Sequence, residues 1–264
     1  MTDAVRNIVR EKLARDEVVA SMTVRLVRTV EIARIARAAG FDTLYVDMEH
    51  SSLSFDTTGQ ICMAAQDCGV TPFVRVPSLR ADDIARVLDG GAMGVIAPHV
   101  RTPEEARAVV EAARFPPRGH RSASGGLPHF DFSPVPAARA NPMLDAATMV
   151  VPMVETLAAL DNVEKIAAVD GVDMLLIGSN DLTAEMGIHG QFDHPRLRDA
   201  FVRVIAACRS RGKHVGVGGL AARPDLVAEF VRLGARYVST GTDLAFLAGA
   251  AAARAKQVRE IERS

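Results

Sequence analysis

Short apolar segments alternate with helix-length amphipathic segments along this chain, and this alternation constrains the fold more than any other feature. Apolar runs occur at 18–22, 43–48, 72–76, 94–98, 149–154, 174–177, 214–217 and 237–240. Segments between them repeat apolar residues at helical spacing, most clearly at 30–39, 81–88, 103–113, 158–168, 195–210 and 224–233. Strands that are apolar along their whole length belong to a parallel sheet covered on both faces. About eight such units predict an α/β fold closed into a (β/α)8 TIM barrel.

An open, doubly wound sheet is the main alternative. Such a sheet carries a glycine-rich turn after its first strand when it binds a dinucleotide. The residues after Met22, TVRLVRTVE, contain no glycine, so the barrel is favoured. With 264 residues, 48% of them hydrophobic, the chain is long enough for one large core, and we expect a single domain over residues 1–264.

The charge balance favours a small-molecule partner. The 31 basic and 32 acidic residues nearly cancel, so we expect binding neither to nucleic acid nor to an anionic membrane surface. The sequence has no apolar run long enough to span a bilayer and no apolar signal stretch near its start, which predicts a cytoplasmic protein. Cys62, Cys68 and Cys208 lack metal-ligand spacing and are expected to be thiols without a chemical role.

Two stretches interrupt the alternation. The segment from Phe115 to Pro142 is rich in Pro, Gly and Ser and too long for an ordinary connection, and we expect it to cover the functional site. The C-terminal stretch AFLAGAAAARAKQVREIERS is helix-forming and rich in small residues. It could close the barrel or pack on a neighbouring subunit, and we expect it to be used in oligomer packing.

In a barrel, catalytic groups lie at the carboxyl ends of the strands, so polar residues just after each apolar run are the candidates. They are Asp47, Glu49, His50, Arg75, His99, Glu155, Ser179, Asn180 and Asp181.

Glu155 and Asp181 are the candidate metal ligands. Either could instead have a helical role, Asp181 as a cap and Glu155 in a first helical turn. Two carboxylates at neighbouring strand ends, however, repel one another unless a cation lies between them. Oxygen ligands suit Mg²⁺, Mn²⁺ or a similar hard divalent ion, and the cofactor we expect is Mg²⁺, Mn²⁺ or Co²⁺.

His50 stands beside an acidic cluster, where a general base is wanted, although it could be a structural histidine. Asp89, in the turn LDGGA, could orient it. Arg75 lies among apolar residues in a strand, so its charge needs an anionic partner or a cavity, and a substrate oxyanion is the simplest candidate. We expect His99, His120, His129 and His189 to lie in surface loops.

At these residues the chain resembles the HpcH/HpaI aldolase family of metal-dependent class II pyruvate aldolases, with the citrate lyase β-subunit group as a more distant relation. The similarity runs from roughly Ala20 to Ala248 through ordered blocks that include FDTLYVDMEH, FVRVP, LLIGSNDL and LGARYVSTGTDLAFL.

The resemblance implies a role for each matching residue. Glu155 and Asp181 match the metal-binding carboxylates, His50 the catalytic histidine, Asp89 its paired acid, and Arg75 the arginine that reaches the substrate oxygen. Asp47 matches an acid near the metal-bound waters, and we expect Glu49 beside it, as a second acid around the metal. Ser179, Asn180 and Asp181 match the segment that binds the pyruvate carboxylate. The resemblance also implies a homo-oligomer, trimer or hexamer.

The chain departs from the family pattern at three places. Met153 stands where relatives commonly carry glutamine, two residues before the metal glutamate, and a thioether is only a weak acceptor. GSNDL replaces the commoner GPADL, and the segment over 122–142 is unusual. The donor half of the reaction is therefore better supported than the acceptor half.

The expected reaction is cleavage or formation of a 4-hydroxy-2-oxo acid through a pyruvate enolate and an aldehyde. No lysine follows a strand among the candidates, which disfavours a Schiff-base aldolase. The alternatives are an acyl-CoA thioester lyase of the citrate lyase β-subunit type, an oxaloacetate decarboxylase, and a barrel that has lost catalysis.

Overall fold

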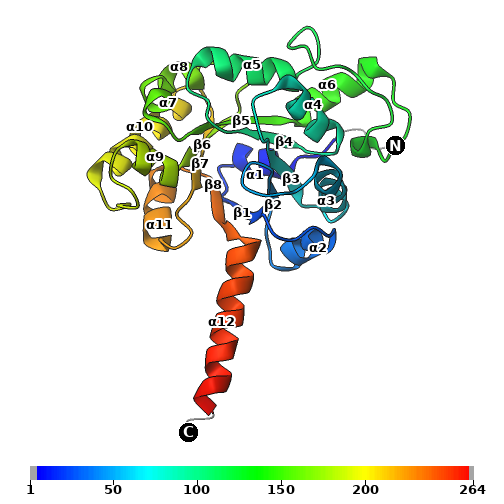
Figure 1. Ribbon diagram of the computed structural model, residues 1–264. Helices are drawn as coiled ribbons and strands as arrows, with labels where there is room; N and C mark the ends of the chain where they lie inside the picture. Colours follow the sequence, from blue (N-terminus) through cyan, green and yellow to red (C-terminus); the bar gives the residue numbers. More distant parts are fainter. Residues whose placement is uncertain (1–4, 262–264) are drawn as a thin grey trace.

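Eight parallel strands close into a barrel in the computed structural model, which describes residues 5–261 (Figure 1). Each strand pairs with the next along the chain, and the last pairs with the first. The strands are β1 (Val19–Val24), β2 (Thr43–Asp47), β3 (Thr71–Arg75), β4 (Gly94–Ala97), β5 (Met149–Val154), β6 (Met174–Gly178), β7 (His214–Gly218) and β8 (Tyr237–Thr242). The predicted TIM barrel is confirmed, and the doubly wound sheet is wrong.

Helices surround the barrel. They are α1 (Ile8–Ala14), α2 (Glu31–Ala38), α3 (Phe55–Asp67), α4 (Ala81–Asp89), α5 (Pro103–Ala113), α6 (Ala137–Ala147), α7 (Leu157–Asp161), α8 (Val163–Ala167), α9 (Ser179–Glu185), α10 (Pro195–Arg209), α11 (Pro224–Leu233) and α12 (Asp243–Ile261), with a short 3-10 turn η1 (Pro128–Phe130). Local sequence explains the start of α5: Thr102 and Glu105 form a capping box, and Pro103 occupies the first helical position.

The hydrophobic core has two main layers. The larger lies between the strands and the helices. The other fills the barrel interior and includes Phe73, Tyr237 and Met153. Val9 and Leu13 of α1 belong to this interior cluster, so α1 closes the barrel at the amino ends of the strands.

The long segment after α5 does not cover the carboxyl ends of the strands, which corrects the expectation for Phe115 to Pro142. It leads from the end of a helix to the start of β5, and every such connection lies at the amino ends of the strands. Its contacts agree: Arg121 donates to Asp89 at 2.7 Å, and His129 donates through Nε2 to the Ala92 carbonyl at 3.2 Å. Both partners lie just before β4.

Helix α12 stands out from the barrel (Figure 1). Apolar side chains along it are exposed, including Leu244 at 51%, Leu247 at 60% and Ile261 at 72%. It therefore does not close its own barrel. Across residues 5–261, no helix has both the length and the apolar composition needed to cross a membrane.

Candidate active site

A cavity of about 540 Å³ opens at the carboxyl ends of the strands. A second cavity, of about 500 Å³, lies beside the amino end of β3 and contains none of the candidates predicted from strand ends. The first is lined by predicted residues from several strand ends and by others that the sequence did not single out. Among them are Thr23, Arg25, Tyr45, His50, Arg75, Met153, Ser179, Asn180, Asp181, Ser239 and Thr242.

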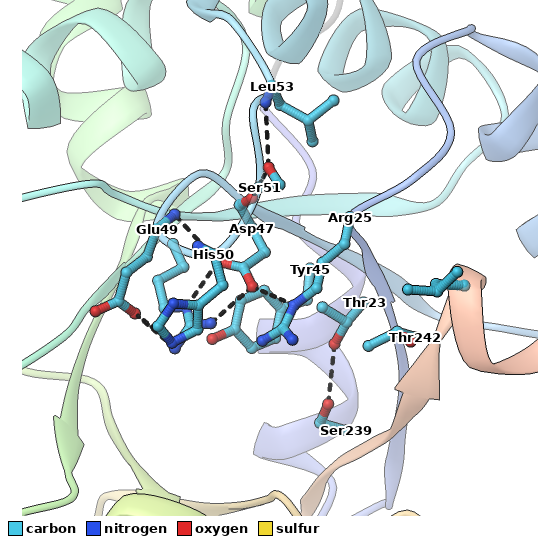
Figure 2. A network of polar contacts seen from close by, with 12 residues as sticks. Thr23, Arg25, Tyr45, Asp47, Glu49, His50, Ser51, Leu53, Ser239 and Thr242 are labelled. Carbon is cyan, nitrogen blue, oxygen red and sulfur yellow. Dashed lines mark hydrogen bonds and ion pairs between the residues drawn. The ribbon is translucent and has the colours of Figure 1, made fainter.

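Asp47 and Arg75 form the buried centre of the site. The residues are register partners on β2 and β3, so strand pairing alone places them side by side. Arg75 donates through Nε and Nη2 to the two carboxylate oxygens of Asp47, at 2.9 and 2.7 Å. Arg25 adds a bond from Nε to Asp47 Oδ2 at 2.6 Å (Figure 2). Burial opposes ionisation of Asp47, but the bonds and charges of the arginines outweigh it and hold its pKa below the usual value.

Glu49 links this pair to two histidines. Its Oε2 lies 2.7 Å from Arg75 Nη1 and 3.7 Å from His50 Nε2. Its Oε1 lies 2.7 Å from His99 Nε2. The His50 side chain is half exposed and faces the cavity, so it can reach a substrate proton.

His99 lies in an exposed turn, as expected, but it is grouped with two acids, which the sequence did not indicate. Its ring lies between two carboxylates, since Nδ1 is 3.2 Å from Glu155 Oε1 while Nε2 contacts Glu49. Its backbone amide also donates to Glu155 Oε1 at 2.6 Å. The residue follows β4 directly, with a left-handed φ of 56° that turns the chain over the site.

Glu155 is buried at the end of β5, and Asp181 is exposed in the first turn of α9, after the neighbouring β6. Burial raises the pKa of Glu155; the hydrogen bond and charge of His99 oppose this rise, and the charges of Glu49 and Asp181 add to it. Among the described residues, Glu155 Oε2 has no hydrogen-bond partner. Gly178 leaves room for this oxygen, because a Cβ there would lie 2.9 Å from it.

The start of α9 brings Ser179 and Asn180 to the cavity beside Asp181. The Ser179 hydroxyl is fully buried and bonds to no group between residues 5 and 261. The first amides of a helix have no partner within the helix. Donors for an anionic substrate group are therefore gathered here.

Asp89 does not approach His50 within one chain. It ends α4, at the amino end of β4, whereas His50 follows the carboxyl end of β2 at the opposite end of the barrel. Asp89 binds Arg121 instead. A barrel cannot bring these two ends together, so a pairing of Asp89 with His50 in the same chain is wrong.

Met153 occupies the barrel interior beneath the cavity. Its sulfur lies 3.9 Å from Arg75 Nη1 and 4.0 Å from the Tyr45 hydroxyl. The Met153 thioether therefore lies next to two polar groups, Arg75 Nη1 and the Tyr45 hydroxyl, that the amide of a glutamine at this position could bind.

Arg25 was not among the predicted residues. The first strand was expected to end at Met22 but continues to Val24, which makes Arg25 a strand-end residue like the others. Extending the rule for strand ends by two residues would have found it.

An α/β barrel with acids, histidines and arginines gathered at its strand ends has the architecture of a TIM-barrel enzyme. The sequence pattern of the HpcH/HpaI aldolase/citrate lyase family matches residues 26–250. The chain belongs to this family.

Two relatives with a named activity are aldolases. The chain is 41% identical over 219 residues to a 4-hydroxy-4-methyl-2-oxoglutarate aldolase of Hapsidospora irregularis, covering 82% of this chain and 81% of that protein. It is 37% identical over 261 residues to a protein of the same name from Chaetomium globosum, covering 98% and 97%. The crystal structure of an HpcH/HpaI aldolase from Desulfitobacterium hafniense DCB-2 superposes with a TM-score of 0.91 at 30% identity, covering 97% and 98%. The chain is accordingly a carbon–carbon lyase of the aldolase type.

Proposed function

We propose that this chain is a divalent-metal-dependent aldolase that cleaves or forms 4-hydroxy-2-oxo acids through a pyruvate enolate. The names of its relatives support this substrate class. The observation that carries the proposal is the buried Glu155, whose Oε2 lacks a hydrogen-bond partner among residues 5–261 and whose pKa is raised in part by the charge of Asp181.

Glu155 and Asp181 fit a divalent cation such as Mg²⁺, Mn²⁺ or Co²⁺. Within the described residues, no group of three or more His, Cys, Asp or Glu side chains is arranged to hold a metal ion. Hard divalent ions in enzyme sites are commonly held by one or two carboxylates together with substrate oxygens and water, so two protein ligands suffice. When bound, the cation would supply Lewis-acid stabilisation of the charge that develops on the keto oxygen.

The remaining chemistry is assigned to protein side chains. In cleavage, His50 accepts the proton of the 4-hydroxyl group, the C4 carbonyl forms, and the C3–C4 bond breaks with its electron pair passing to the pyruvate enolate. Arg75, with Asp47 holding it in place, presents a fixed positive charge to the enolate oxygen. Ser179, Asn180 and the backbone at Asp181 bind the pyruvate carboxylate. Protonation at C3 releases pyruvate, and condensation is the reverse.

We also propose a homo-oligomer, trimer or hexamer, in which α12 packs on another copy. This helix buries little on its own barrel and exposes Leu244, Phe246 and Leu247. Helix α2 also exposes Ile35, at 57%, and Phe41, which follows α2, packs on Phe246 of α12 with 6.2 Å between ring centroids. Exposed apolar side chains in this number are typical of an interface.

The test is to strip the purified protein with a chelator and follow pyruvate release from a 4-hydroxy-2-oxo acid, with and without added Mn²⁺ or Mg²⁺. Release that returns only with the metal supports the proposal. Release from oxaloacetate alone would identify a decarboxylase instead, and release from an acyl-CoA thioester alone would identify a thioester lyase. Inactivity of the folded, metal-loaded protein on all three would leave a barrel without catalysis.

A further inference from the structure

Arg25 is a cation of the cavity that the proposed mechanism does not use. Its side chain is 35% exposed and lines the cavity wall after β1. A guanidinium has five N–H donors. Only Nε of Arg25 is engaged, by Asp47, and the terminal nitrogens donate to no acceptor among residues 5–261. Those donors are available to a ligand.

The structure holds Arg25 in place before any ligand arrives. The buried carboxylate of Asp243, at the start of α12, accepts bonds from the backbone amides of Arg25, Leu26 and Val27 at 2.8 to 3.2 Å. The Asp47 bond holds the guanidinium group at Nε. A charged group whose backbone and side chain are both held loses less conformational freedom on binding.

The wall beside Arg25 is polar. Thr23 and Ser239 share a hydrogen bond at 3.1 Å, and both line the cavity together with Thr242 (Figure 2). Apolar side chains, among them Phe192, Ala221 and Ala245, line other parts of the same cavity. On this side, a carboxylate would find a guanidinium and hydroxyl groups.

The position of Arg25 relative to Arg75 indicates which carbon of the substrate would carry a carboxylate bound by Arg25. Both guanidinium groups bond to the same oxygen, Asp47 Oδ2, so they are neighbours. In the proposed reaction, Arg75 faces the oxygen on C2. Only C3 separates C2 from C4, so a group attached to C4 lies next to the group bound at Arg75.

We infer that Arg25 binds a carboxylate attached to C4, so that the substrate is a 4-hydroxy-2-oxo dicarboxylate and the acceptor half is a 2-oxo acid rather than a simple aldehyde. This rests on the proposed function. Cleavage of such a substrate breaks C3–C4, moves the 4-hydroxyl proton to the base, and gives pyruvate and a second 2-oxo acid. Arg25 is thus a specificity-determining residue of the acceptor side.

The experiment compares two substrates on the metal-loaded protein: 4-hydroxy-2-oxopentanoate and its analogue with a carboxylate added at C4. The wild type is expected to favour the dicarboxylate in kcat/KM by about 100-fold, the usual scale for a charge-assisted bidentate bond. Arg25→Gln keeps a donor for Asp47 but removes the charge, and it is expected to abolish most of this preference, mainly through KM. Arg25→Lys should keep part of it, and Arg28→Met, at an exposed arginine outside the cavity, should keep all of it.

The possible results distinguish failure of the inference about Arg25 from failure of the proposed function. Exchange of the pyruvate methyl protons with deuterated solvent reports the donor half alone. Metal-dependent exchange with a wild-type preference for the monocarboxylate overturns the role of Arg25 and leaves the aldolase intact. Equal loss of both substrates in Arg25→Gln also overturns it, because Arg25 would then act only through Asp47. Absence of both exchange and cleavage overturns the proposed function and the inference together.

Discussion

Asp47 and Arg75 stand opposite each other on β2 and β3, and the two oxygens of the carboxylate take two separate N–H donors of the guanidinium. Strand register therefore fixes the charge that the proposed mechanism presents to the enolate. Lysine could supply the charge but not the two parallel bonds.

Arg75→Lys is accordingly expected to lower kcat for pyruvate release by about 100-fold or more, on the scale of losing one oriented donor to a developing oxyanion. Arg75→Ala should abolish turnover. Steady-state kinetics on the metal-loaded protein measures both, and Arg203→Lys, at an exposed ion pair with Glu164, is the matched control. Near-normal kcat in Arg75→Ala would remove Arg75 from the mechanism.

Glu155→Gln is expected to weaken Mn²⁺ binding by at least about 100-fold. This is a larger loss than usually follows removal of a residue that contacts only the metal's ligands. The fold should persist, since a glutamine oxygen can still accept from the His99 amide and a buried negative charge is removed. Calorimetric titration measures the affinity, and the thermal midpoint of the chelator-stripped protein is the control. Unchanged Mn²⁺ affinity would place the metal elsewhere.

Met153→Gln introduces an amide within reach of Arg75 Nη1 and the Tyr45 hydroxyl. Since both can bind its oxygen, we expect an active protein destabilised by no more than about 1 kcal/mol. Urea unfolding and kcat/KM measure the two effects, with Met153→Leu as the apolar control. A variant that loses activity while staying folded would show that the thioether itself is required.

His129 makes stability depend on pH at the end of the barrel remote from the cavity. Burial lowers its pKa to about 4, so the folded state stays neutral where the unfolded histidine, near 6.5, takes up a proton. Its contribution to stability is present above about pH 6.5 and is lost as the pH falls toward 4, by about 2 to 3 kcal/mol.

In His129→Gln, the glutamine amide can still donate to the Ala92 carbonyl. The stability of this variant should therefore fall less than that of the wild type as the pH is lowered. Urea unfolding at pH 7 and pH 4.5 tests it, with exposed His189→Gln as the control. Parallel pH profiles for the wild type and His129→Gln would contradict the assignment.

Leu244→Lys combined with Leu247→Lys is expected to reduce the oligomer to smaller species, because charges replace exposed apolar contacts of α12. Light scattering after gel filtration gives the mass. Lys256→Ala changes a charged residue of the same helix and should leave the mass unchanged. A wild type that is monomeric across the working concentration range would refute the proposed packing.

The eight strands were predictable because each is buried on both faces and so carries an uninterrupted apolar signal. Most of the site was predictable for a related reason: strand ends in a barrel converge, so Asp47, Arg75, Glu155 and Asp181 could be collected without knowing their distances. Arg25 required the exact end of β1. His99 could be collected as a strand-end residue, but its grouping with Glu49 and Glu155 required contacts between distant segments. Asp89 and the segment from Phe115 to Pro142 required knowing which end of the barrel each connection reaches.

The placement of that long segment has a practical consequence for altering substrate range. Its unusual composition makes it the obvious place for mutant libraries, yet it joins α5 to β5 beneath the barrel, where Arg121 and His129 anchor it. Substitutions in this segment are expected to change stability rather than substrate range. Within a single chain, selection for new acceptors should vary the rim formed by the ends of β1 and β8.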